Sequence, residues 1–141
     1  RVLMAAFGSP WLNHKDPAVR LSNYLNTGSV LLLADMNATF ENCIVEGSLE
    51  EELGLDSSSS TTPPLFTYMF DHCLLRTKQA ASGHYLSIIA NTDPLWIDRT
   101  KDDYHLKAAS SCINSGIVTT VTDDLDGILR DATPDLGAFE Y

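Results

Sequence analysis

Acidic side chains near the C-terminal end of the sequence have a spacing close to that of a calcium-binding loop. Residues 122–127 place aspartates at alternate positions before a glycine. An EF-hand loop also needs an acidic first ligand and a glutamate at its twelfth position, and threonine occupies both here. One interpretation is Ca²⁺ bound by Asp123, Asp124 and Asp126. The other is a tight turn whose aspartates accept backbone N–H bonds, with Arg130 paired to one of them.

A second group of side chains has the chemistry to contact a carbohydrate. Asp71, Arg76 and Lys78 lie on or just beyond an expected strand and offer charged hydrogen-bonding groups for sugar hydroxyls. Trp11, in a loop bounded by prolines, and Tyr68 are aromatic rings of the kind that stack on sugars. We therefore predict carbohydrate binding by Trp11, Tyr68, Asp71, Arg76 and Lys78. In the alternative interpretation these polar positions only continue ladders between neighbouring strands.

No set of residues in the sequence defines a catalytic centre. A glycosidase needs two carboxyl groups about 5–5.5 Å or 6.5–9.5 Å apart. Asp93, Asp98, Asp102 and Asp103 are candidates by type, but they also suit turns, where aspartate fixes loop geometry. The sequence contains no glycine-rich phosphate loop, zinc-ligand spacing or nucleophilic serine motif. We predict no catalytic residues and no cofactor other than the possible Ca²⁺.

Charge and hydropathy exclude some partner classes. Nine Lys and Arg residues against nineteen Asp and Glu residues give a net charge of −10 over 141 residues. Such a surface repels phosphate backbones, so we expect no nucleic-acid partner. No apolar run approaches the roughly 20 residues of a membrane span, so we expect no membrane-spanning segment.

The strongest pattern is an internal repeat. Phe40-Glu41-Asn42-Cys43-Ile44-Val45 returns thirty residues later as Phe70-Asp71-His72-Cys73-Leu74-Leu75. Short apolar segments that recur at this distance indicate stacked strands. Stacking would place Cys43 and Cys73 about 4.8 Å apart. Buried thiols fit that placement better than a disulfide, whose geometry is poor between parallel Cβ vectors, although the redox state of these cysteines and of Cys112 stays open.

Other segments predict the elements around the repeat. The continuously apolar run 30–34 predicts a fully buried strand, and residues 85–90 predict another. The Ser-, Thr- and Pro-rich part of residues 46–64 predicts an inserted loop. Turns become frequent after residue 91, which is typical of a capping unit, and Trp96 is expected to be buried there.

The C-terminal segment carries a family resemblance. Its blocks are Asn91-Thr92-Asp93-Pro94-Leu95-Trp96-Ile97-Asp98, Ala109-Ser110-Ser111-Cys112-Ile113-Asn114-Ser115-Gly116 and Pro134-Asp135-Leu136-Gly137-Ala138-Phe139-Glu140-Tyr141. In order and spacing it resembles the C-terminal region of bacterial pectin-lyase-like surface proteins of the "choice-of-anchor Q" type. The resemblance implies a right-handed parallel β-helix, export to the cell surface or periplasm, and contact with polysaccharide. It supplies no catalytic set for these positions.

The predicted fold is therefore an all-β, right-handed, single-stranded parallel β-helix. Residues 1–90 would form its rungs, and residues 91–141 would cap the last rung within one domain. The start at Arg1 looks like the middle of a strand, so we expect a fragment whose first rung pairs with the preceding part of the same protein or with another copy. The leading function is a non-catalytic scaffold that contacts cell-surface or dietary polysaccharide. The alternatives are a polysaccharide lyase or glycoside hydrolase with its active site upstream, and an adhesin-like stalk.

Overall fold

The computed structural model describes residues 3–6, 14–80 and 82–141, and this part of the chain is all-β. It contains thirteen short strands and one 3₁₀ helix, η1 (Arg99–Lys101). Among these residues no helix is long and apolar enough to cross a membrane. Two of the sequence-predicted features, Trp11 and the start at Arg1, lie outside the described residues.

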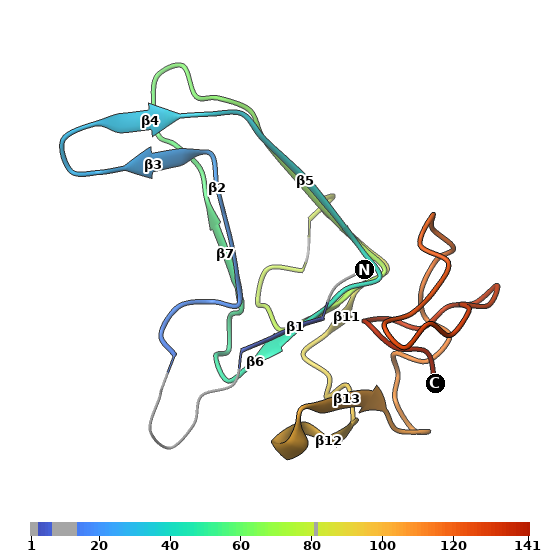
Figure 1. Cartoon of the computed structure of the whole chain (residues 1–141). Helices are drawn as coiled ribbons and strands as arrows, with labels where there is room; N and C mark the ends of the chain where they lie inside the picture. The colour runs from blue at the N-terminus through green and yellow to red at the C-terminus, as the bar shows by residue number, and fades with distance from the viewer. Residues whose placement is uncertain (1–2, 7–13, 81) are drawn as a thin grey trace.

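Two parallel sheets form the centre of the structure (Figure 1). The larger has the order β1 (Leu3–Ala6), β6 (Ile44–Gly47), β9 (Leu74–Leu75) and β11 (Ile89–Ala90). The smaller has the order β10 (Tyr85–Leu86), β8 (Phe66–Asp71) and β5 (Met36–Glu41). Side chains of β5 alternate between half-buried and exposed, as expected for a strand with one face toward a core.

Three further sheets contain only two strands each. β2 (Val19–Ser22) pairs in parallel with β7 (Leu53–Asp56). β3 (Tyr24–Asn26) and β4 (Leu31–Leu33) form an antiparallel hairpin. β12 (Trp96–Asp98) and β13 (Asp103–Leu106) form another, joined through η1.

The two repeated segments lie side by side in register, as the sequence predicted. Phe40 is opposite Phe70 in the parallel pairing of β5 with β8, and Ile44 is opposite Leu74 in the pairing of β6 with β9. Between the two strands of each copy the chain turns at Asn42 or His72, whose φ angles are 52° and 47°. This left-handed conformation is tolerated best by residues such as asparagine, glycine and histidine, which explains the matching polar position.

The prediction of a right-handed single-stranded parallel β-helix is wrong. In the described part of the chain the strands fall into five separate sheets of two to four strands, two of which are antiparallel pairs, and no long sheet is stacked into a solenoid. The physical reason is that the pairing segments shorten to two residues at β9, β10 and β11, and irregular segments of unequal length separate them. A repeat seen in two copies establishes one pairing, and it does not establish a continuing series of coils.

Apolar side chains form two clusters on opposite sides of β6 and β9. One contains the alternate residues Cys43, Val45, Cys73 and Leu75, together with Phe70. The other contains Ile44 and Leu74, and the C-terminal segment covers it with Trp96, Leu106, Cys112 and Leu136. Because both faces of these strands are buried, their sequences are continuously apolar instead of alternating.

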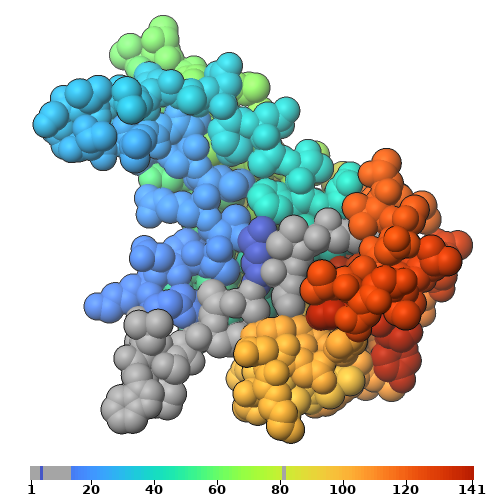
Figure 2. Space-filling model, viewed as in Figure 1, coloured from blue at the N-terminus to red at the C-terminus, as the bar shows by residue number. Residues whose placement is uncertain are grey.

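The hairpin β3–β4 departs from the sequence prediction for residues 30–34. That run was expected to be a fully buried strand, but Leu31, Leu32 and Leu33 are 50%, 53% and 41% exposed. They lie on an antiparallel pair that projects from the two central sheets (Figure 1), and Figure 2 shows the hairpin uncovered on the viewed face. A continuous apolar run is therefore compatible with exposure, because nothing in the described part of the chain packs over this corner.

Candidate functional site

A polar pocket lies beside the ends of β9 and β11. Glu50, Arg76, Lys78 and Asn91 line it, and its volume is about 290 Å³. Arg76 directly follows β9 and Asn91 directly follows β11. Asn91 N donates to Leu75 O of β9, and Arg76 N donates to Val45 O of β6, each at 2.9 Å. Parallel strands end at the same edge of a sheet, so the residues after them converge.

Hydrogen bonds hold the pocket side chains in place. Arg76 Nε donates to Leu49 O at 2.9 Å, which fixes the guanidinium against the loop that carries Glu50. Asn91 uses both ends of its amide on Thr77, donating to its carbonyl at 2.9 Å and accepting from its N–H at 3.1 Å. Arg76 and Asn91 are therefore positioned by the backbone before any ligand arrives.

Lys78 and Glu50 form an ion pair at the mouth of the pocket, with Nζ and Oε2 2.5 Å apart. The hydrogen bond from Lys78 lowers the pKa of Glu50, and Glu50 raises the pKa of Lys78. Both side chains are well exposed, so the pair contributes little to stability. The pocket thus contains one carboxylate, Glu50, beside the basic side chains of Arg76 and Lys78.

The structure brings together only part of the predicted carbohydrate site. Arg76 and Lys78 share the pocket, whereas Tyr68 stacks on His84, with ring centroids 4.4 Å apart, and does not line it. Asp71 pairs with His72 at 2.7 Å between Oδ1 and Nδ1. Sequence reasoning missed Glu50 and Asn91. The acidic run 50–52 was visible, but its approach to β9 depends on the path of a loop.

The predicted calcium ligands are engaged in other interactions. Asp124 Oδ1 accepts the N–H groups of Asp126 and Ile128 at 2.9 and 2.7 Å, and Asp124 Oδ2 accepts that of Glu140 at 2.9 Å. Burial alone would raise the pKa of Asp124, but these hydrogen bonds outweigh burial and lower it. Asp123 belongs to an isolated bridge with Leu129.

The tight-turn interpretation is right that an aspartate, Asp124, accepts backbone N–H bonds. It is wrong about the partner of Arg130, which is not one of these aspartates. Arg130 pairs with the carboxylate of Glu140, and it also donates to the carbonyls of Asp135 and Gly137. In the described residues no group of three or more His, Cys, Asp or Glu side chains could hold a metal ion. Calcium binding stays a prediction.

His105 connects the hairpin β12–β13 to the C-terminal segment. Its Nδ1 lies 2.7 Å from Asp103 Oδ1, its Nε2 lies 2.9 Å from Asp126 Oδ2, and its ring stacks on Phe139 at 4.1 Å. The hydrogen bonds with Asp126 and Asp103 raise the pKa of His105. Because both ring nitrogens are occupied by carboxylates, this cluster is a charge-assisted link and does not leave a nitrogen for a substrate.

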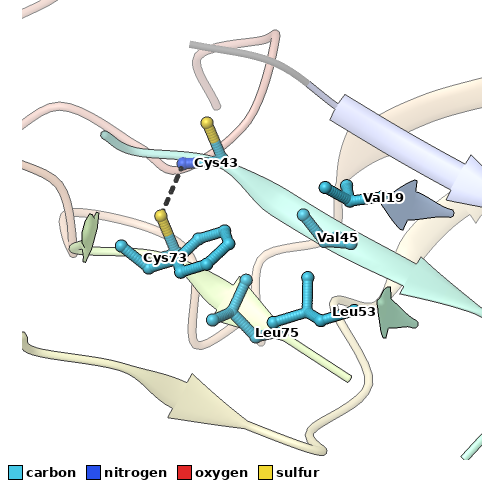
Figure 3. Close-up of a cluster of buried hydrophobic side chains, with 7 residues drawn as sticks. Val19, Cys43, Val45, Leu53, Cys73 and Leu75 are labelled. Atoms are coloured by element: carbon cyan, nitrogen blue, oxygen red, sulfur yellow. Dashed lines mark hydrogen bonds between the residues drawn. The ribbon is translucent and has the colours of Figure 1, made fainter. Parts of the chain in front are cut away.

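The three cysteines are buried thiols with no disulfide, and Figure 3 shows two of them, Cys43 and Cys73. Cys43 N donates to Cys73 Sγ at 3.4 Å, and Cys73 Sγ lies 3.3 Å from Asp71 O. Hydrogen bonding with Cys43 and burial raise the pKa of Cys73, and burial raises that of Cys112 to about 11. Thiolate is the reactive form, so these sites are poor nucleophiles.

Comparison of the chain with protein-family models and with curated proteins found no match. The resemblance to pectin-lyase-like surface proteins is therefore unsupported by these comparisons, and the pocket chemistry is the basis for a functional proposal.

Proposed function

We propose that the chain is a non-catalytic scaffold that binds an uncharged carbohydrate through the pocket of Glu50, Arg76, Lys78 and Asn91. The observation that carries the proposal is the convergence of a carboxylate, two cations and an amide in one cavity of about 290 Å³. Small-molecule sites start at about 300 Å³, so the cavity suits one or two sugar rings and not a larger cofactor.

The donors and acceptors of the pocket match sugar hydroxyls. A hydroxyl both donates and accepts hydrogen bonds, a carboxylate accepts, and guanidinium and ammonium groups donate. Glu50 and Lys78 are exposed enough to turn from each other toward a ligand, while Arg76 is held by its bond to Leu49 O. Arg76 is thus a fixed donor, and Glu50 and Lys78 can adjust around the ligand. This combination favours sugars whose hydroxyl groups point in the matching directions.

The same chemistry argues against catalysis in the pocket. Glu50 is the one carboxyl group among the lining residues, and Lys78 lowers its pKa, so it is a poor general acid at neutral pH. Arginine stays protonated and does not accept a proton. Glycoside hydrolysis by the usual route needs two carboxyl groups across the sugar, and the pocket supplies one.

The net charge of the chain limits the class of glycan that it could bind and bears on where the protein would act. A net charge of −10 repels acidic polysaccharides, so we propose a neutral glycan of a cell surface or of the diet. Binding of this kind fits an exported protein. We propose no nucleic-acid ligand, because the negative charge of the chain also repels a phosphate backbone.

The test is a binding measurement with neutral and acidic oligosaccharides by isothermal titration calorimetry. Lys78→Met should weaken binding of the neutral ligand by about tenfold, because a charged hydrogen bond to a ligand is lost. Lys101→Met is the matched control, since Lys101 is also an exposed lysine paired with an acid, Asp98, at 2.9 Å. Binding unaffected by Lys78→Met, or release of new reducing ends from the ligand, would overturn the proposal.

A further inference from the structure

Three polar side chains that do not line the carbohydrate pocket form a hydrogen-bonded series. His14 Nδ1 lies 3.2 Å from Ser48 Oγ, and His14 Nε2 lies 3.2 Å from Glu52 Oε1. β1 pairs with β6 and β2 pairs with β7, so the residues that enter β2 lie beside those that connect β6 to β7 (Figure 1). His14 and Ser48 are 34 residues apart in the sequence, so no local motif predicts their contact.

Glu52 is the fixed end of this series. It is fully buried, and its side chain accepts the N–H of Leu49 on Oε1 at 2.8 Å and that of Ala18 on Oε2 at 2.9 Å. Its own N–H donates to Arg76 O at 2.9 Å. A buried carboxyl group needs partners of this kind, and together they hold Glu52 in place against His14.

The contacts of Glu52 decide which nitrogen of His14 carries the ring proton. Both carboxyl oxygens already accept backbone N–H groups, so the carboxyl group acts as an acceptor and His14 Nε2 is the donor. Nδ1 then has a lone pair that faces the hydroxyl of Ser48. A neutral imidazole in this position takes the hydroxyl proton when the serine oxygen attacks an electrophile.

Exposure increases along the series from the acid to the serine. The exposed fraction of the side chain is 0% for Glu52 and 19% for His14, and Ser48 is an exposed residue. In nucleophilic serine sites a buried acid orients a histidine, and the histidine contacts a serine within about 2.6–3.2 Å. The need to pair the buried Glu52 explains one contact of His14, but it does not explain why a hydroxyl occupies the other ring nitrogen.

From this geometry we propose that Ser48 is a reactive serine that accepts an acyl group from an activated ester. His14 acts as its base, and Glu52 is a positioning residue. Ser48 Oγ forms a bond to the carbonyl carbon, and its proton passes to His14 Nδ1. The bond from that carbon to the leaving oxygen then breaks, and the leaving oxygen takes the proton from Nδ1. The products are an ester on Ser48 and a free alcohol, so the reaction modifies the scaffold once and involves no turnover.

The experiment is treatment of the full chain with p-nitrophenyl acetate, followed by intact mass and peptide mapping. Hydroxylamine removes an acetyl ester and leaves acetyl-lysine intact, which separates serine labelling from lysine labelling. We expect one hydroxylamine-sensitive acetyl group, located on Ser48, and none in Ser48→Ala. His14→Gln should lower the rate of this labelling by about 10²-fold, the usual contribution of a general base.

His84→Gln is the matched control for His14→Gln. His84 is also an exposed histidine, but its Nδ1 lies 2.9 Å from Tyr68 O and it has no contact with Ser48. This variant should therefore leave the rate at Ser48 unchanged. Circular dichroism checks that both histidine variants fold.

The role of Glu52 needs a readout that folding alone does not change. Nitrogen NMR of the wild-type chain should show the ring proton of His14 on Nε2. Glu52→Gln should remove this preference and lower labelling of Ser48 by about tenfold or more. Ser48→Ala changes only an exposed hydroxyl, so it tests the site even where Glu52→Gln does not fold.

Three results would each overturn the proposal. The first is an absence of ester on Ser48, or labelling spread equally over several serines. The second is an equal rate in the wild type and in a folded His14→Gln variant. The third is a wild-type His14 whose ring proton lies on Nδ1, because that proton would block transfer from the hydroxyl.

Discussion

The ring of Phe40 stacks on the ring of Phe70, with centroids 4.7 Å apart and planes inclined by 14°. On its other face Phe70 stacks against Tyr85 at 5.6 Å and 7°. These contacts join β5, β8 and β10 through their side chains as the backbone joins them through its hydrogen bonds. Phe70 is fully buried because it has a neighbour on both faces, whereas Phe40 at the end of the stack is half-buried.

Truncation of Phe70 and truncation of Phe40 should lower the free energy of unfolding by different amounts. We expect Phe70→Ala to lower the free energy of unfolding by about 3–5 kcal/mol, since it removes a fully buried ring and leaves a cavity. Phe40→Ala should cost clearly less, because one side of that ring already faces solvent. Urea denaturation followed by circular dichroism measures both values. Equal losses would show that the two rings are not packed differently.

Asn42 should be the most sensitive of the turn residues with positive φ. Its buried side chain donates to Ile117 O at 2.6 Å and accepts from Ile117 N at 2.8 Å, which ties the C-terminal segment to the turn before β6. Asn42→Ala should cost about 2–4 kcal/mol, because it loses both bonds and keeps the unfavourable φ.

His72 provides the comparison for Asn42, since it has a similar φ of 47° but bonds to the side chain of Asp71 and not to the C-terminal segment. His72→Ala should therefore leave hydrogen exchange at the Ile117 amide unchanged, whereas Asn42→Ala should speed it. An unprotected Ile117 amide in the wild type would contradict this prediction.

The link through His105 should make stability depend on pH with a definite sign. The folded state raises the pKa of His105, so its contribution is fully present below the unfolded pKa of about 6.5 and is lost as pH rises through the folded value. The hydrogen bond with His105 lowers the pKa of Asp103, so that contribution is lost as pH falls through the folded pKa of Asp103.

The two dependences leave a window, above the unfolded pKa of Asp103 and below the unfolded pKa of His105, in which the link contributes most to stability. We expect the urea midpoint of the wild type to exceed that of His105→Gln by more at pH 5.5 than at pH 8.5. Phe139→Leu, which keeps both carboxylates beside the histidine, serves as a control for packing. A difference that is constant with pH would show that the charge of His105 does not contribute.

The three cysteines should resist alkylation in the folded protein. All three are buried, and their environment raises the pKa of Cys73 and of Cys112, so little thiolate is present at pH 8. Intact mass after iodoacetamide treatment should show no adduct under native conditions and three in urea without reductant. A single adduct in urea would instead indicate a disulfide and contradict the thiol state.

The part of the fold that could be predicted from the sequence is the part that a repeated local pattern specifies, and contacts set by the path of a loop could not be predicted. The pairing of residues 40–45 with 70–75 was predictable because identical spacing of apolar residues gives identical strands, which stack in register. The long-range pairing of Asn42 with Ile117 and the antiparallel hairpin β3–β4 were not predicted, because loop paths decide them. The extension of one pairing into a whole β-helix failed for that reason.

The sequence by itself determined the strand character of its apolar segments, the register of the repeat and the acidic charge. These properties depend on residue type and on neighbours within a few positions. Only the tertiary structure decided that Glu50 and Asn91 join Arg76 and Lys78, and that Leu32 is exposed while Leu74 is buried. Both outcomes depend on which distant segment covers a given strand, and burial by a distant segment leaves no periodic pattern in the chain.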